Sequence, residues 1–267
     1  MDRDIYVHGH HESVLRSHTW RTIENSAKYL ESHLVDNLTL LDVGCGPGTI
    51  TIELATRIPN GRVVGIDLSE EIVMKAKASS VSSLQKNCSF EIGDVYNLDF
   101  PDNSFDIVHA HQLLQHLTKP VEAIKEMYRV VRPGGIIALR DADYGGMIWS
   151  PQDPRLDDWM DLYQQMTGKN HVEANAGRCL FGWVSEIPFT TIEVSTSTWT
   201  FATPESREWW GSLWAERIQK STFAQQALIH GLTQQESLDG LSNAFTNWAA
   251  QPDGFFLVPH GEIIAVK

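Results

Sequence analysis

Leu40-Leu-Asp-Val-Gly-Cys-Gly-Pro-Gly-Thr49 is the stretch of this sequence that decides the expected fold. An apolar run ends at Asp42, glycines follow at alternate positions, and apolar residues then recur at helical spacing from Ile50. Glycine lets the backbone turn tightly and approach a ligand closely, while the start of a helix offers N–H groups that lack partners. The stretch therefore predicts a strand, a ligand-binding loop and a helix.

The spacing of the glycines distinguishes between two classes of nucleotide-binding loop. A dinucleotide-binding loop has the pattern Gly-x-Gly-x-x-Gly. Counting from Gly44, the third glycine of that pattern would fall on Thr49, whereas the sequence has glycine at 46 and 48. The observed spacing therefore disfavours a dinucleotide loop.

Strands and helices are predicted to alternate through the first half of the chain. Apolar runs bounded by turn residues predict strands, and apolar residues at a spacing of three and four predict helices. This alternation indicates a doubly wound α/β fold with a mostly parallel sheet covered on both faces. The predicted strands are 38–43, 63–66, 89–92, 105–110 and 136–139, and the predicted helices are 50–57, 70–78 and 119–131.

We expect a single domain over residues 1–267, because no linker, repeat or low-complexity segment interrupts the chain. Apolar spacing predicts a helix over 19–34, and later patterns predict helices at 154–166 and 177–187, a strand at 190–201 and three helices within 204–250. The expected parts are an N-terminal lid and helix (1–37), a cofactor-binding sheet core (38–202), a helical substrate cap inserted before the last strand (203–250) and a final strand or hairpin (251–267).

The histidines near the N-terminus allow two interpretations. His8, His10 and His11 are a metal site or part of a polar lid over a pocket. Metal sites usually add cysteine or carboxylate ligands at set spacings, and none is evident here. The sequence therefore favours the lid, and we expect no metal.

The composition excludes several classes of function. A formal net charge of −13 disfavours nucleic-acid binding, which depends on neutralising phosphates. The 3 cysteines are scattered, as is typical of a reducing compartment. No secretory signal is visible, and no apolar run approaches the roughly 20 residues that span a bilayer. We therefore expect a cytoplasmic protein, a monomer or homodimer.

Carboxylates follow two of the predicted strands. Asp67, after the second strand, can accept hydrogen bonds from both hydroxyls of a ribose, although dinucleotide enzymes use an acidic residue in the same way. Asp94, after the third strand, can accept a hydrogen bond from the amino group of an adenine, with Val95 behind the ring. Arg132-Pro-Gly-Gly135 predicts a type II turn before the fifth strand.

These features together make residues 38–141 resemble the S-adenosylmethionine (SAM) binding core of class I methyltransferases. The resemblance is strongest to the ubiquinone/menaquinone C-methyltransferase-like (methyltransferase type 11) group. It implies a seven-stranded sheet, SAM as cofactor and S-adenosylhomocysteine as product. The matching segments are Leu-Asp-Val-Gly-Cys-Gly-Pro-Gly at 41–48, Ser-Phe-Asp-Ile-Val at 104–108, Leu-Leu-Gln-His at 113–116 and Arg-Val-Val-Arg-Pro-Gly-Gly at 129–135.

The resemblance also implies which residues contact the cofactor. Tyr6 and Arg21 are two further candidates, for the lid and for the carboxylate of SAM. The implied contacts are Asp42, Gly44, Cys45 and Gly46 for the methionine end, Asp67 and Leu68 for the ribose, Asp94 and Val95 for the adenine, and Ala110 and His111 for the sulfonium end.

Methyl transfer is an in-line displacement, so holding the acceptor in place is the main task of the enzyme. An oxygen or nitrogen acceptor also needs a general base, and the candidates are His111 and His116, whose unperturbed pKa lies near 6.5. The alternative for His116 is a hydrogen-bonded packing residue.

Aromatic residues are concentrated between Trp199 and Phe256. They indicate an apolar acceptor pocket, or core packing of the helical cap, or both. We expect a SAM-dependent methyltransferase acting on a small, fairly hydrophobic metabolite, quinone-like or secondary. The alternatives are a SAM-fold enzyme with a non-methylating reaction and an inactive SAM-binding regulatory or scaffold subunit. The aromatic residues are Trp199, Phe201, Trp209, Trp210, Trp214, Phe223, Phe245, Trp248, Phe255 and Phe256.

Overall fold

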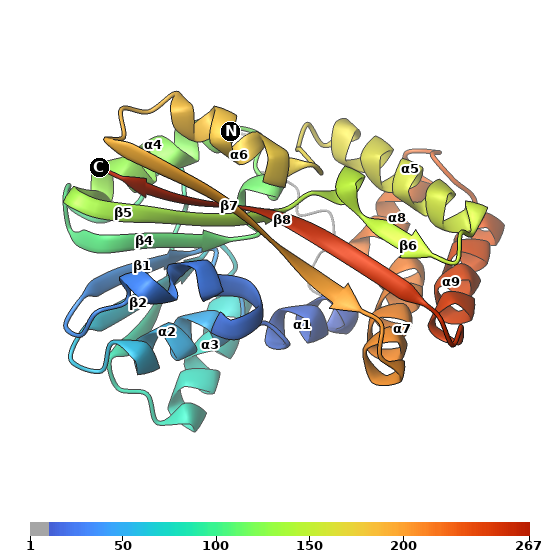
Figure 1. Ribbon diagram of the computed structural model, residues 1–267, viewed down its shortest axis with the longest axis horizontal. Coiled ribbons are helices and arrows are strands. Elements are labelled where there is room, and N and C mark those ends of the chain that lie inside the picture. Colours follow the sequence, from blue (N-terminus) through green and yellow to red (C-terminus); the bar gives the residue numbers. More distant parts are fainter. Residues whose placement is uncertain (1–10) are drawn as a thin grey trace.

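The computed structural model describes residues 11–267, which form a sheet flanked by helices (Figure 1). The sheet has 8 strands, in the order β3-β2-β1-β4-β5-β8-β6, with β7 paired to the free side of β8. Strands β1 to β5 are parallel, and β8 pairs antiparallel with β5, β6 and β7. The strands are β1 (Thr39–Val43), β2 (Arg62–Asp67), β3 (Cys88–Ile92), β4 (Phe105–His111), β5 (Val131–Ala142), β6 (Ile148–Ser150), β7 (Thr191–Phe201) and β8 (Phe255–Val266).

The predicted doubly wound, mostly parallel sheet is confirmed, and the described residues add the short strand β6 to the seven strands expected. Strand β6 has 3 residues, too few to form a periodic pattern in the sequence. The last segment forms the single strand β8 of 12 residues and not a hairpin, although it contains Pro259 and Gly261.

Helices cover both faces of the sheet, which explains the continuous apolar character of its central strands. Apolar side chains of β1, β4 and β5 pack on one face against α2 and the short helices η1 and η2, while α4 and α6 pack on the other. A smaller cluster joins α3 to β3. These helices are η1 (Ile23–Ala27), η2 (Lys28–His33), α2 (Thr49–Arg57), α3 (Glu70–Ser83), α4 (Pro120–Val130) and α6 (Ala176–Ser185).

The helix expected over 19–34 is not one continuous α-helix, because only residue 19 and residues 23–33 of that span are helical. The chain forms α1 (Glu12–Thr19) and then restarts as η1, a π-helix, and η2, a 3₁₀ helix. The cause is a capping box: the Thr22 hydroxyl accepts from the N–H of Asn25, and the Asn25 side chain accepts from the N–H of Thr22. The apolar side chains Ile23, Ala27 and Leu30 still face the core, as the pattern predicted.

The predicted turn at Arg132–Gly135 lies inside a longer strand. Gly134 has φ of +75°, a left-handed conformation that glycine adopts readily. The register of β5 with β4 shifts between the pairs Phe105–Val131 and Ile107–Ile136, so the turn residues bulge out of the sheet.

A helical cap lies beside the sheet, on the right in Figure 1. Three of its helices lie between β7 and β8, as predicted, and α5 packs against them. Eight of the ten aromatic residues singled out in the sequence are buried, all except Trp209 and Phe255. Core packing therefore accounts for most of the aromatic density. The cap helices are α5 (Pro154–Lys169), α7 (Pro204–Lys220), α8 (Thr222–Ile229) and α9 (Gln235–Ala249).

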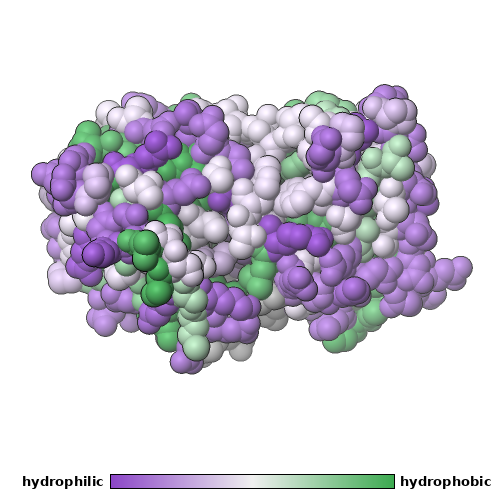
Figure 2. Space-filling model, turned by 90° about the horizontal axis from the view of Figure 1, so that it is seen from below, coloured by the Kyte–Doolittle hydropathy of each residue, from purple (hydrophilic) through white to green (hydrophobic). Residues whose placement is uncertain are grey.

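On the face shown in Figure 2, hydrophobic side chains form small, separate patches among hydrophilic ones. In the part of the chain that the structure describes, no helix is both long and apolar enough to cross a membrane.

We predict that Gly48→Ala destabilises the fold more than Gly134→Ala. Both glycines have left-handed φ, of +84° and +75°, so both substitutions add backbone strain of ~1 kcal/mol. A Cβ at position 48 would also lie 2.6 Å from Phe90, whereas a Cβ at position 134 would have no atom of residues 11–267 within 4 Å. Urea unfolding should show a loss of about 2–4 kcal/mol at position 48 and ~1 kcal/mol at position 134. Equal losses would contradict the packing argument.

Candidate active site

The glycine loop between β1 and α2 is joined to the end of β2. Gly44, Gly46 and Gly48 have φ of +70°, +56° and +84°, which side chains other than glycine rarely adopt. The N–H of Gly46 donates to Asp67 Oδ2 at 3.1 Å, and the N–H of Ser69 donates to Asp67 Oδ1 at 3.0 Å. The structure thus brings the predicted ribose and methionine residues together at the carboxyl edge of the sheet.

Asp42 lies beneath this loop, inside the protein. Its Oδ2 accepts from the Thr51 hydroxyl at 2.5 Å, and its Oδ1 lies 2.7 Å from His109 Nδ1. Asp42 is 3% exposed, so both oxygens serve bonds within the core. This carboxylate links β1, α2 and β4.

Three other predicted contacts have buried side chains. Cys45 packs with Phe90, and burial raises the pKa of its thiol well above the usual range. Val95 and Ala110 belong to the apolar cluster beneath α4 and α6. For Cys45 the backbone, whose N–H donates to the Ile66 carbonyl at 2.9 Å, sets the shape of the loop.

Leu68 and Asp94, predicted for the ribose and adenine, line one cavity beyond the carboxyl ends of β2 and β3. Its volume is about 380 Å³, and Leu68 is half-exposed there. The Asp94 carboxylate accepts from the N–H of Tyr96 at 2.9 Å. The other lining residues are Ile66, Glu91, Ile92, Gly93, Asn97, Asp99 and Phe100.

The end of β4 places His111 in a closed, polar environment. His111 is 5% exposed, and neither ring nitrogen has a hydrogen-bond partner among the described residues. Its ring centroid lies 6.0 Å from that of Trp199. Burial, then Arg21 and Arg140, hold the pKa of His111 well below 6.5, so the imidazole is neutral.

His116 lies in the short helix η3 (Leu114–His116), and its ring is also neutral. Burial, with added repulsion from Arg21 and Arg217, lowers its pKa from 6.5 to about 3. The Nε2 atoms of His116 and Gln115 lie 3.1 Å apart. Both predicted base candidates are therefore uncharged and near Arg21.

Asp141, at the end of β5, is a candidate that the sequence interpretation did not include. It is fully buried, its Oδ1 accepts from the N–H of Gln115 at 3.2 Å, and its Oδ2 has no partner in the described part of the chain. Burial raises its pKa from 3.8 to about 7. Its position after an apolar strand was the available signal, because ligands bind at the carboxyl ends of such strands.

Helix α1 lies against the glycine loop and the cap. The Thr49 hydroxyl donates to the carbonyl of His18 at 3.0 Å, and Arg217 of α7 donates to the Ser17 hydroxyl at 2.9 Å. Tyr6, His8 and His10 lie outside the described residues.

His11 caps α1 by accepting from the N–H of Ser13 at 3.2 Å. Among residues 11–267 the structure brings no three His, Cys, Asp or Glu side chains together in a metal-binding group.

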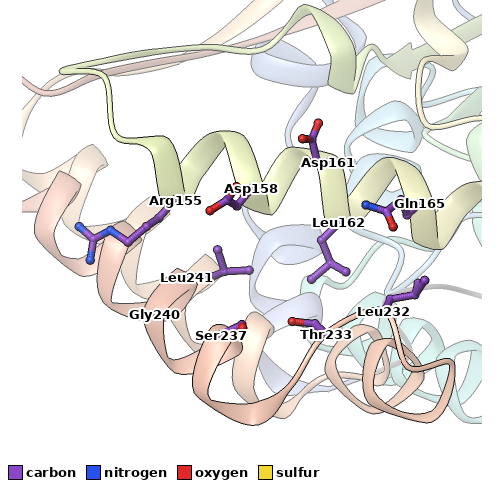
Figure 3. Close-up of a pocket in the computed structure, with 10 residues that line it drawn as sticks. All are labelled: Arg155, Asp158, Asp161, Leu162, Gln165, Leu232, Thr233, Ser237, Gly240 and Leu241. Atoms are coloured by element: carbon purple, nitrogen blue, oxygen red, sulfur yellow. The ribbon is translucent and has the colours of Figure 1, made fainter.

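A second cavity, of about 400 Å³, lies within the cap between α5 and the α8–α9 segment (Figure 3). Leu162 and Leu241 point toward one another across it, while Asp161 points away. None of the predicted site residues that the structure describes lines this cavity. The lining residues are Arg155, Asp158, Asp161, Leu162, Gln165, Leu232, Thr233, Ser237, Gly240 and Leu241.

Comparison with known proteins defines the class to which this fold and site belong. Residues 34–212 match the family model described as a methyltransferase domain, and the chain belongs to this family. The chain is 34% identical to an uncharacterized methyltransferase of Schizosaccharomyces pombe, over 100% of this chain and 98% of the relative. It is 28% identical to the probable methyltransferase ltbC of Aspergillus luteorubrus, over 98% of this chain and 97% of the relative.

A solved structure has the same fold. Phosphoethanolamine N-methyltransferase 2 of Haemonchus contortus, in complex with SAM, aligns with a TM-score of 0.59 at 18% identity, over 98% of this chain and 60% of that one. Together with the family match and the 34% identical relative, this fold makes the protein a class I SAM-dependent methyltransferase. The site fits this cofactor, because three left-handed glycines leave alternate positions of the loop without side chains, and the buried nitrogens of His111 have no partner among residues 11–267.

We predict that Asp141 makes the stability of the protein fall as pH rises from 4 to 7. The folded state keeps the proton of Asp141 up to about pH 7, while the unfolded chain releases it near 3.8, so the folded state binds more protons between these values. His116, with a folded pKa of about 3, has the opposite effect below pH 6.5.

A comparison with Asp141→Asn isolates the contribution of Asp141. Urea unfolding at pH 4.5 and pH 8 should show the wild type losing ~3 kcal/mol of stability relative to the variant. A constant difference between the two proteins across this range would contradict the raised pKa.

Proposed function

We propose that the protein transfers the methyl group of SAM to a small, fairly hydrophobic metabolite held at the ends of β4 and β5. The observation that carries this proposal is the environment of His111, which is buried beside Trp199 while its nitrogens have no hydrogen-bond partner in the described part of the chain. A bound ligand with polar groups on an apolar body would satisfy these atoms and keep the site dry. The aromatic cap gives weaker support, since most of its rings pack against each other.

The same proposal assigns the cofactor residues. Gly44, Cys45 and Gly46 would meet the methionine end through their backbone, Asp67 and Leu68 the ribose, and Asp94 and Val95 the adenine. Ala110 and His111 would lie at the sulfonium end. Support for this assignment comes from the bond between Gly46 and Asp67 and from the cavity that Leu68 and Asp94 share. Asp42 would act from beneath the loop, by holding Thr51 and His109.

SAM supplies an electrophilic methyl group on a positively charged sulfur. The residues of the chain hold the acceptor in line and exclude water, an arrangement that can lower a barrier by roughly 7–11 kcal/mol. A neutral imidazole with a pKa near 3, such as that of His116, is a weak base. Asp141, with a pKa of about 7, is better matched to taking a proton near neutral pH. We therefore add Asp141 to His111 and His116 as a candidate base.

Two measurements test this function. Calorimetry with SAM and S-adenosylhomocysteine should show binding below the millimolar range. Incubation of metabolite extracts with methyl-labelled SAM should then transfer label to a small apolar product. Absence of cofactor binding, or label that appears only on protein or nucleic acid, would refute the proposal.

We predict that Asp67→Asn weakens SAM binding by about 10- to 100-fold, because hydrogen bonds to a charged acceptor are worth about 1.5–3 kcal/mol. The asparagine amide can accept from only one of the two N–H groups that Asp67 binds, those of Gly46 and Ser69, so the free energy of unfolding should also fall by about 1–3 kcal/mol. Calorimetry with SAM measures the first effect and urea unfolding the second. Glu70→Gln, an exposed charge removal three residues away, is the matched control and should bind SAM as the wild type does. Unchanged affinity in Asp67→Asn would remove the ribose assignment.

A further inference from the structure

Gln112, directly after β4, has an unusual backbone conformation. Its φ is +50°, in the left-handed region that residues with side chains rarely adopt. Its N–H donates to the carbonyl of Arg140 at 2.7 Å, which keeps the chain next to β5 at this turn. Strained residues of this kind persist only where their surroundings hold them in place, and they concentrate at functional sites.

The side chain of Gln112 is held from two sides. Its Oε1 accepts from Arg21 Nη2 at 2.5 Å, and its Nε2 lies 2.8 Å from His260 Nε2. His260 Nδ1 lies 3.0 Å from the carbonyl of Val258, which can only accept, so the proton is on Nδ1 and Nε2 accepts from Gln112. Every bond in this chain of contacts therefore has one donor and one acceptor.

The three residues come from distant parts of the sequence. Arg21 follows α1, Gln112 follows β4, and His260 lies in the middle of β8. His260 is 1% exposed and packs against Trp199 with ring centroids 4.4 Å apart. The contacts thus connect the end of β4 to strand β8 and to the segment directly after α1.

We propose that Gln112 is a positioning residue, which holds the end of β4 in the shape that SAM binding needs, and that Arg21 acts on SAM through Gln112. This inference rests on the proposed placement of the sulfonium end at Ala110 and His111. It changes the role expected for Arg21, which the sequence interpretation placed against the carboxylate of SAM. In the structure, the guanidinium of Arg21 donates to a side chain of the protein at the end of β4.

A double-mutant cycle with SAM as the probe distinguishes the two roles of Arg21. Calorimetry on Arg21→Ala and Gln112→Ala should show affinities for SAM lowered by at least about tenfold in each. The double variant should lose no more than the weaker-binding single variant, because both changes break the same connection. Losses that multiply in the double variant would overturn the proposal.

5′-Methylthioadenosine, which lacks the amino-acid tail of SAM, gives a second comparison. A direct contact between Arg21 and the SAM carboxylate predicts that Arg21→Ala weakens binding of SAM but leaves binding of 5′-methylthioadenosine unchanged in every background. Positioning through Gln112 predicts instead that Arg21→Ala has no further effect on SAM once Gln112 is alanine. The first result would overturn the proposal and the second would support it.

Gln112→Gly separates positioning from stability. Glycine adopts positive φ without strain, so this variant should unfold at a higher urea concentration than Gln112→Ala. We expect it to bind SAM as weakly as Gln112→Ala, because the bonds to Arg21 and His260 are absent in both. Recovery of stability and SAM affinity together would show that only the turn matters and would overturn the proposal. A wild-type protein that binds no SAM would refute the proposed function, whereas variants that bind SAM like the wild type refute this inference alone.

Discussion

The buried carboxylate of Asp42 is the constraint on which the rest of the structure depends. It accepts a hydrogen bond from the Thr51 hydroxyl in α2 and contacts the His109 ring in β4. One side chain of β1 therefore connects this strand to α2 and to β4. A buried carboxylate without such partners would be costly, and the pairing therefore fixes the relative positions of β1, α2 and β4. The hydrogen bond between Asp42 and Thr51 also joins the strand before the glycine loop to the helix after it, so the flexible loop is fixed at both ends.

Much of the fold followed from local patterns. The alternating glycines, the apolar strands and the turn at Gly134 were sufficient to predict a doubly wound sheet and its carboxyl edge, because each depends on residues close in sequence. The split of the N-terminal helix was missed, since the apolar spacing continues through Thr22 and Asn25 while their side chains end one helix and start the next. The short strand β6 was missed because three residues carry no periodicity.

The site was predicted less completely than the fold, for a related reason. Asp67 and Asp94 could be proposed because each follows its own strand. Gln112 gains its importance from Arg21 and His260, which are 91 and 148 residues away in sequence. These contacts arise because β8 returns antiparallel beside β5, and no spacing in the sequence reveals which residues that return brings together. For the aromatic residues of the cap, the sequence suggested more of a site than the structure contains. Their density indicated an acceptor pocket, but most of these side chains pack together in the core of the cap.

Strand β8 also limits how the cap can move. It pairs with β5 through residues 260–266, with β6 through residues 255–257, and with β7 over residues 256–266. Strand β8 therefore runs without interruption from the sheet to the cap. A hinge motion between the sheet and the cap would have to break backbone hydrogen bonds between β8 and its neighbouring strands. Helix α1, in contrast, is joined to the start of α2 and to α7 by hydrogen bonds of side chains, such as those of Thr49 and Arg217. A change in the spacing between the glycine loop and the cap would therefore cost the fewest hydrogen bonds at α1, whereas a change between the sheet and the cap would cost those of β8.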